Sequence, residues 1–412
     1  MFRIPFAAAL AGLLTSSALL AQEWPRFRGP NGAGQSDATT IPVAWNADDL
    51  LWKVELPGVG NSSPVLWGDS IFLTSADATD GTRHVFCLSA RDGRLLWQRD
   101  YPAARYLVHQ QNTFASSTPA ADAKRVYCAW ATPEELALLA FDHHGNELWR
   151  LPLGSFTSQH GFAASPIVYR DLVILTNDQD SDSFLVAVDA ASGAIRWKIP
   201  RQVLVEQNAS YAAPCIRQRA GHPDELIVVG RSHGVASLDP TTGSTRWELA
   251  ALERRPVGSP VLFENLVLAA CGDGAGNNAV VAVEPPNSPD GEPQVAYRID
   301  RALAPYVPTM VAHGKLVFLW NDRGIASCID GATGKVHWRE RVGGNYFSSP
   351  VRVADRIYGV SVDGEVVCLA AAEEFQLLGR SALGETSRAT PAVAGGRMFL
   401  RTESHLLAVG QP

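Results

Sequence analysis

The chain has 412 residues, a formal net charge of −7, 46% hydrophobic residues and 19% charged residues. This balance excludes an intrinsically disordered chain, which is poorer in apolar residues and richer in charge. The absence of a basic stripe argues against nucleic-acid binding, and after residue 21 no stretch approaches the ~20 apolar residues of a membrane helix.

Residues 1–21 are expected to be a signal peptide. Arg3 supplies the positive start, Phe6 to Leu20 form the apolar run, and Ala21 is the small residue at the cut. We expect cleavage before Gln22, and without a cysteine near that site we expect no lipid anchor there. The mature protein is therefore predicted to be periplasmic or secreted.

Residues 22–49 are predicted to be a strap without regular structure. Trp24 to Gly34 reads Trp-Pro-Arg-Phe-Arg-Gly-Pro-Asn-Gly-Ala-Gly, and such Gly- and Pro-rich segments interrupt helices and strands. We expect its aromatic and arginine side chains to hold it on the surface of the domain that follows.

From residue 50 onward, two repeated patterns dominate the chain. A glycine stands four residues before a tryptophan in five places, at Gly93, Gly145, Gly193, Gly243 and Gly334. A second series, mostly Ser/Thr-Pro, recurs at intervals of roughly 40 to 55 residues and ends in Pro64, Pro119, Pro166, Pro214, Pro260, Pro308, Pro350 and Pro391. A period in this range, built of strands and tight turns, is typical of a β-propeller.

One repeat unit predicts four strands. Pro350 begins the innermost strand, where its missing N–H is tolerated; residues 356–361 form the second strand and residues 365–369 the third. The outer strand carries the tryptophan, which we interpret as a structural wedge between neighbouring units. These docking residues are predicted to be Trp52, Trp97, Trp149, Trp197, Trp247 and Trp338.

The count of units gives eight blades in an all-β domain over residues 50–412. Seven begin near residues 61, 116, 163, 211, 257, 305 and 347, with Tyr297 and Leu378 in place of the tryptophan in the fifth and seventh. The eighth begins at Thr390 and ends after three strands. Residues 50–56 match the outer strands, so we expect this N-terminal strand to complete the last blade and close the ring, removing an exposed edge.

Six cysteines leave two possibilities open. Export permits disulfides, but Cys87, Cys328 and Cys368 occupy one repeat position that Ala187 and Ser237 fill elsewhere. That substitution pattern is typical of a small buried residue, and it favours free thiols.

The strand, Leu-Asp, Thr-Gly and Trp pattern resembles the tryptophan-docking repeat of the pyrroloquinoline-quinone (PQQ) propeller superfamily, over about residues 50–410. The opening Trp24–Gly34 is similar to the start of secreted PQQ-like repeat proteins. The resemblance implies an eight-bladed propeller and two kinds of function. One is that of the quinoprotein alcohol and glucose dehydrogenases; the other is that of the partner-binding propeller lipoprotein of the outer-membrane β-barrel assembly machinery.

The enzymatic branch of this resemblance lacks its residues here. The chain has no adjacent cysteine pair, no Cys-x-x-Cys-His haem motif and no matching calcium ligands. No catalytic residue can be assigned, and neither PQQ, calcium nor another metal is expected. Residues 177–182 carry alternating acids but lack the central glycine of a calcium loop, so a solvated turn is predicted. His143 and His144 are expected to be exposed, and Gly272–Gly276 to be a hairpin loop rather than a phosphate cradle.

The loops that lead into each inner strand are predicted to surround one mouth of the central channel. They carry aromatic, amide and cationic side chains, which would suit a polar ligand or an extended peptide. The alternative is that they only pack the loops. The candidates are Asn61, Asn112, Phe114, His160, Phe162, Asn208, Tyr211, Arg255, Tyr306, Tyr346, Phe347 and Arg388.

The sequence therefore favours an exported, monomeric, non-catalytic scaffold that binds a protein, peptide or envelope component at the channel mouth. A PQQ- and calcium-dependent alcohol or sugar dehydrogenase is the main alternative, and a hydrolase or carbohydrate-binding protein is a third. An acid-rich pocket with a tryptophan floor would favour the cofactor, whereas an aromatic and amide rim would favour a partner.

Overall fold

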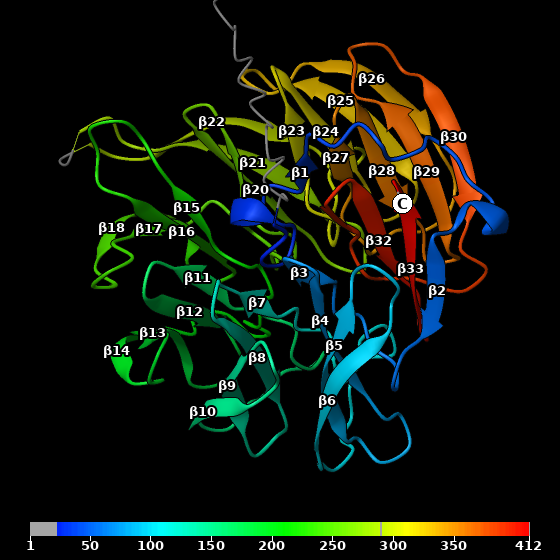
Figure 1. Cartoon of the computed structure of the whole chain (residues 1–412). Coiled ribbons are helices and arrows are strands. Elements are labelled where there is room, and N and C mark those ends of the chain that lie inside the picture. The colour runs from blue at the N-terminus through cyan, green and yellow to red at the C-terminus, as the bar shows by residue number, and fades with distance from the viewer. Residues whose placement is uncertain (1–22, 289–290, 412) are drawn as a thin grey trace, which may run out of the picture.

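The computed structural model describes residues 23–288 and 291–411, so the predicted signal peptide lies outside the described residues. Eight sheets stand around a central channel as the blades of a propeller, and their strands are antiparallel except for the parallel pair of β1 with β27 (Figure 1). Helical structure in the described ranges amounts to the 3-10 turns η1 (Pro30–Gly32) and η2 (Ala47–Asp49). No helix there is long and apolar enough to cross a membrane. The all-β, eight-bladed prediction is confirmed.

The first four blades follow chain order. Blade one holds β3 (Val65–Trp67), β4 (Ser70–Ala76), β5 (Arg83–Ser89) and β6 (Leu95–Tyr101). Blade two holds β7 (Ala120–Ala121), β8 (Arg125–Ala131), β9 (Leu136–Asp142) and β10 (Glu147–Pro152). Blade three holds β11 (Ile167–Tyr169), β12 (Leu172–Asn177), β13 (Ser183–Asp189) and β14 (Ile195–Arg201). Blade four holds β15 (Cys215–Arg217), β16 (Glu225–Gly230), β17 (Gly234–Leu238) and β18 (Thr245–Leu249).

The remaining blades complete the ring. Blade five holds β19 (Val261–Phe263), β20 (Leu266–Cys271), β21 (Ala279–Glu284) and β22 (Gln294–Ile299). Blade six holds β23 (Val311–His313), β24 (Leu316–Trp320), β25 (Ile325–Asp330) and β26 (Val336–Arg341). Blade seven holds β27 (Val351–Val353), β28 (Arg356–Val360), β29 (Glu365–Ala370), β30 (Leu377–Ala382) and, beside β27, the short β1 (Gln35–Ser36). Blade eight holds β31 (Ala392–Ala394), β32 (Arg397–Arg401), β33 (His405–Gly410) and β2 (Trp52–Glu55).

The N-terminal strand closes the ring as the sequence predicts. β2 pairs antiparallel with β33, with Trp52 opposite Ala408 and Glu55 opposite His405, so the blue and red ends of the chain lie side by side (Figure 1). The last blade thus joins the two ends of the domain, and its outer edge is formed by β2.

Adjacent blades are joined at their outer edge by the aromatic residue of the fourth strand. The indole N–H of Trp97 donates to the His143 carbonyl at 2.8 Å, and that of Trp149 donates to the Ala190 carbonyl at 3.2 Å, each in the next blade. A glycine in the turn of the next blade packs against each indole, Gly145 against Trp97 and Gly193 against Trp149. In blade five, Tyr297 takes this place and donates to the Gly331 carbonyl at 2.7 Å. Trp247 differs, because its indole N–H lies 3.4 Å from Glu225 of its own blade.

A belt of hydroxyls joins the blades at their inner edge. The backbone N–H of Ser63 donates to Thr118 Oγ1 of the next blade at 2.9 Å, and the same link recurs around the ring. The hydroxyls that accept are those of Ser63, Thr118, Ser165, Ser259, Thr309, Ser349 and Thr390. Blade four breaks the series because Ala213 has no hydroxyl to receive the N–H of Ser165.

The belt corrects the register of the sixth blade. The sequence pattern aligns Val307-Pro308 with the other Ser/Thr-Pro pairs. In the structure Thr309 takes the belt position, accepting from Ser259 N–H and donating its own N–H to Ser349 Oγ, each at 2.9 Å. Pro308 is thus one residue before the belt position, whereas the other prolines follow it.

The strap is not a surface segment but crosses the channel. Trp24 and Arg28 are fully buried. Arg26 donates to the Pro214 carbonyl of blade four at 2.6 Å, while Arg28 donates to the Met310 and Pro350 carbonyls of blades six and seven at 2.7 and 3.0 Å. Because Trp24 also pairs with Leu66 of blade one, the strap contacts blades on several sides of the ring and spans one end of the channel.

All six cysteines are free and buried, which agrees with the favoured interpretation of their repeat position. Burial raises the pKa of the Cys87 and Cys328 thiols to about 12, so these thiols stay protonated and unreactive at neutral pH.

The glycine that covers each tryptophan provides a test of blade docking. Gly193 has φ +72°, and an added Cβ would lie 2.7 Å from the Trp149 ring. We expect Gly193→Ala to lower the free energy of unfolding by about 1–2 kcal/mol for the left-handed backbone and by a further ~1–3 kcal/mol for overpacking. Gly68→Ala is the matched control, because Gly68 has φ +55° with nothing within 4 Å of the added Cβ. Equal losses in chemical denaturation of the two variants would contradict the docking role.

Candidate binding cavity

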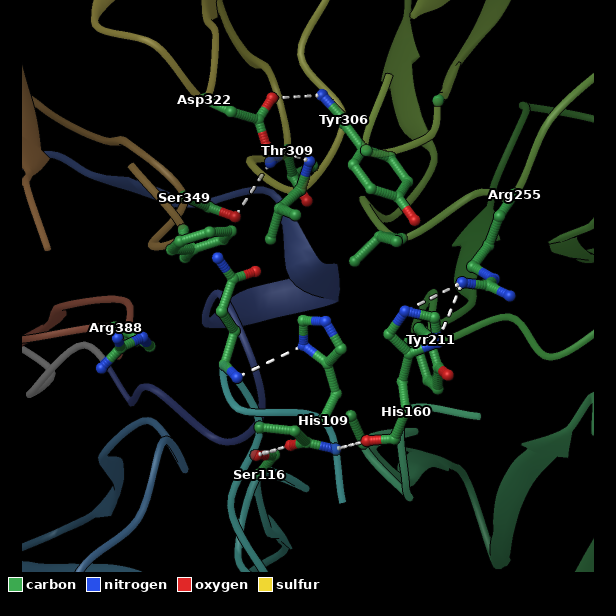
Figure 2. Close-up of a pocket in the computed structure, with 18 of the residues that line it drawn as sticks. His109, Ser116, His160, Tyr211, Arg255, Tyr306, Thr309, Asp322, Ser349 and Arg388 are labelled. Carbon is green, nitrogen blue, oxygen red and sulfur yellow. Dashed lines mark hydrogen bonds between the residues drawn. The ribbon is translucent and has the colours of Figure 1, made fainter. Parts of the chain in front are cut away.

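The end of the channel opposite the strap opens into a cavity of about 1070 Å³. Two kinds of segment form its wall. Interblade loops connect the outer strand of one blade to the inner strand of the next, and central hairpins connect the second and third strands of a blade. Figure 2 shows their side chains converging, with the dark blue strap crossing behind them.

The floor of the cavity is built from the belt and the strap. Six belt residues line it, namely Ser63, Thr118, Ser165, Thr309, Ser349 and Thr390. Phe27 of the strap also lines it, held between the anchored Arg26 and Arg28. Each belt hydroxyl already accepts a backbone N–H, so its own hydrogen is left to donate.

Eight of the twelve candidates from the sequence line this cavity. They are Asn61, Asn112, His160, Tyr211, Arg255, Tyr306, Phe347 and Arg388. His109, Arg254 and Asn345, from the same interblade loops, line it as well. Residues separated by more than 300 positions in the chain are thus brought to one wall.

The other four candidates are placed behind the wall. Phe162 packs edge-on against Phe156 at 5.3 Å in the apolar core, and Tyr346 packs against Trp320 at 5.1 Å. Asn208 is buried and donates to the Gln179 carbonyl at 3.1 Å. Phe114 lies under the guanidinium of Arg83, 4.7 Å from its ring centre. Burial of their apolar rings, or full use of their hydrogen bonds, withdraws these side chains from the cavity.

The central hairpins contribute residues that the sequence analysis did not select. Arg231, Asp273, Asn321, Asp322 and Arg323 line the cavity from these turns. The predicted strand order could have found them, because in a four-stranded antiparallel blade the turn between strands two and three lies at the same end as the loop entering strand one.

The cavity wall is cationic although the chain is acidic overall. Six arginines line it, Arg231, Arg254, Arg255, Arg301, Arg323 and Arg388, against the carboxylates of Asp273 and Asp322. Asp273 is paired with Arg254 at 3.0 Å. Asp322 accepts the N–H groups of Tyr306 and Val307 at 2.7 and 3.0 Å, and burial raises its pKa. Within the described residues the other five arginines form no ion pair with a carboxylate.

Arg255 and His160 contact each other on the wall of the cavity. Arg255 Nη1 lies 3.1 Å from His160 Nδ1, and Nη2 donates to the Gln207 carbonyl at 3.3 Å (Figure 2). Burial, with the charge of Arg255 second, lowers the pKa of His160 to about 4. His160 is therefore a neutral acceptor at physiological pH. The centre of the His109 ring lies 4.8 Å from that of His160, with the two planes tilted by 38°.

The wall does not match a PQQ site with calcium. Among the described residues no group of three or more His, Cys, Asp or Glu side chains could hold a metal ion. The residues that line the cavity include neither tryptophan nor cysteine, and the two carboxylates are engaged as described. These residues do not fit the acid-rich pocket that the cofactor hypothesis requires.

Two other predicted segments are structural. The hairpin at 177–182 is solvated only at its tip, where Ser181 and Asp182 are exposed. Its first half is buried, because Asn177 and Gln179 are 1% exposed and Asp178 pairs with Arg201 at 2.6 Å. His143 is half-buried rather than exposed: its Nε2 lies 2.9 Å from the Asp122 carbonyl oxygen, and its ring lies 5.2 Å from that of Phe72. Gly272–Gly276 is a hairpin loop as predicted, and Asp273 within it caps Ala275 N–H at 3.0 Å.

Fold and cavity together define the class: an eight-bladed β-propeller of PQQ-like repeats with a cavity at one mouth. The chain belongs to the family described as outer membrane protein assembly factor BamB, whose family model matches residues 81–340 and residues 277–410. None of the curated proteins compared with the chain matches it.

Solved structures share the fold at low sequence identity. BamB from Moraxella catarrhalis is 16% identical, with a TM-score of 0.62 over 86% of this chain and 95% of that one. Quinohemoprotein alcohol dehydrogenase from Comamonas testosteroni is 14% identical, with a TM-score of 0.66 over 94% of this chain and 80% of that one. The computationally designed Ika8 protein is 13% identical, with a TM-score of 0.62 over 88% and 100%. At these identities the likeness shows the architecture alone.

The low pKa of His160 gives a prediction for acid conditions. Because its pKa is about 4 in the folded protein, below the ordinary histidine value of 6.5 expected in the unfolded chain, the unfolded chain binds the proton first. This group therefore makes stability fall as pH decreases from about 6.5 to 4. Histidine NMR should show a resonance titrating near pH 4, assigned by its loss in His160→Gln, and Arg255→Gln should raise that pKa. A pKa near 6.5 for the resonance assigned to His160 would contradict its described contact with Arg255.

Proposed function

We propose that the protein is a non-catalytic scaffold that binds a segment of a partner protein in the cavity at its channel mouth. The observation that carries the proposal is the composition of the wall. Arginines, amides and the rings of Tyr211, Tyr306 and Phe347 surround a cavity of about 1070 Å³. Such a mixture supplies aromatic contact area together with donors and acceptors for a peptide backbone.

The same wall supports binding over catalysis. A nucleophile needs a base within hydrogen-bond reach, and the base needs a group that orients it. His160 is held by Arg255, which is a donor and lowers its basicity. The hydroxyls of the belt contact backbone N–H groups of neighbouring blades. No acid–base pair is formed by the contacts of these residues.

An envelope location completes the proposal. Residues 1–21 have the pattern of a secretory signal peptide. The family's description and the BamB structure from Moraxella catarrhalis both belong to an outer membrane protein assembly factor. We infer an exported protein whose partner is another component of the cell envelope.

Photocrosslinking in cells would test the partner. A benzoylphenylalanine in place of Phe347 on the cavity wall should give a discrete adduct, because that side chain is half-buried beside the opening. Leu148, 46% exposed on β10, provides the control position on the outer face. Adducts absent from position 347, or equal at the two positions, would contradict binding at the mouth.

The dehydrogenase alternative has one observation in its favour, since PQQ carries carboxylates that arginines could bind. Calorimetric titration of the mature protein with PQQ, with and without Ca²⁺, decides the matter. We expect no saturable binding, because the wall has no metal-ligand group to go with the arginines. Tight, calcium-dependent, one-to-one binding would instead establish the quinoprotein function and call for a screen of alcohols and sugars.

A further inference from the structure

We propose that the cavity binds the acidic carboxyl-terminal end of a peptide chain, which enters end-on and places its terminal carboxylate at Arg255. This inference rests on the proposed function and names the chemistry of the segment bound. Four features of the cavity carry it: an unpaired buried cation, a segregated charge, a closed base and an amide-rich wall.

The first feature is the incomplete pairing of Arg255. Arg255 is only 6% exposed, and its Nε has no hydrogen-bond partner within the described residues. Its hydrogen bonds to His160 and to the Gln207 carbonyl, and its contacts with the Tyr211 ring and the Tyr306 hydroxyl, are all with neutral groups. A buried guanidinium without a carboxylate carries a desolvation cost that an anionic ligand would offset. A carboxylate matches its planar donors.

The second feature is where the positive charge lies. Arg231 donates to the Glu206 and Gln207 carbonyls at 2.9 and 3.0 Å, so it too is held without a carboxylate. The Nε of Arg388 is also buried, and it has no hydrogen-bond partner among the described residues. The whole chain nevertheless carries a net charge of −7. A long polyanion such as a nucleic acid would be repelled outside the cavity, whereas a short acidic end would be attracted into it.

The third feature is the closed base. Phe27 lies at the floor, and the strap that carries it is bonded to blades one, four, six and seven, so it obstructs this end of the channel. A ligand must enter and leave by the same opening. The cavity of about 1070 Å³ also exceeds the ~300–1,000 Å³ common for small ligands. A chain end fits this shape better than a loop or a small anion.

The fourth feature is the amide content of the wall. Eight amide side chains line the cavity. Four of them already bond within the protein, namely those of Asn61, Asn112, Asn278 and Asn321. The other four make no side-chain hydrogen bond within the described residues, namely those of Gln111, Gln159, Gln207 and Asn345. Each side-chain amide donates and accepts, as the peptide backbone does. Capture of a terminal carboxylate is a recurring mode of peptide recognition, and these amides would hold the residues that precede it.

The test begins with a pool of randomised decapeptides that have free carboxyl termini, passed over the immobilised mature protein. The bound fraction is sequenced by mass spectrometry. We expect enrichment of Asp and Glu in the last few positions. Enrichment of basic or neutral peptides, or no enrichment, would overturn the proposal.

The affinity of an enriched peptide is then measured by calorimetry for the unsubstituted protein and for three variants. Arg255→Gln should weaken binding about tenfold or more, because a charge-assisted hydrogen bond is lost. Arg255→Lys should recover part of the affinity by restoring the charge. Arg246→Gln is the matched control, since it removes one positive charge where Arg246 is paired with Asp239 at 2.9 Å. It should leave binding unchanged, and thermal unfolding should show that all variants are folded.

Amidation of the peptide's carboxyl terminus separates end-on capture from general acidity. We expect it to weaken binding to the unsubstituted protein about tenfold and to have little effect on Arg255→Gln. An equal loss in both proteins would overturn the placement of the carboxylate at Arg255. Displacement of the peptide by micromolar inorganic phosphate or PQQ would assign the cavity to a small anion instead.

The outcomes distinguish this inference from the proposed function. A partner crosslinked at position 347 together with a pool that selects no acidic ends would retain the scaffold and reject the acidic terminus. Absence of both the adduct and the peptide binding would reject the two together.

Discussion

The architecture depends on contact between blades, because no blade buries both of its faces alone. Trp197 shows the requirement: it packs in one apolar cluster with Leu226 and Val228 of the next blade. This cluster is complete only when blade four packs against blade three, and blade four in turn needs blade five to cover its other face. A linear array would leave two apolar faces in water. Closure by β2 against β33 therefore supports every other contact in the ring.

A scaffold that is fixed in this way leaves its loops free to carry chemistry. The outer turns are committed to the aromatic docking, and the inner edge is committed to the hydroxyl belt. The interblade loops and central hairpins at the open end serve neither purpose for most of their side chains. The five cavity arginines that lack carboxylate partners are found on these segments, which is consistent with a rigid body that presents a variable mouth.

The sequence was sufficient for the blades, since glycine and tryptophan at fixed spacing report a local turn and its neighbour. It was also sufficient for the interblade loops, which bring eight of the candidate residues to one cavity. It could not decide rotation within a loop: Phe162 turns into the core while His160, two residues earlier, faces the cavity. It also misplaced the sixth blade, because proline marked the repeat and Thr309, which makes the bond, carried no such marker.

The strap crosses the ring beside the joint that lacks an inner hydroxyl bond. Between blades three and four, the indole N–H of Trp197 donates to the Pro240 carbonyl at the outer edge. At the inner edge the hydroxyl bond of the belt is missing, because Ala213 has no hydroxyl. Asn31 of the strap exchanges two hydrogen bonds with Ile216 in β15, and Arg26 donates to the carbonyl of Pro214, directly before that strand. The strap thus links blade four, at the joint without the hydroxyl bond, to blades six and seven.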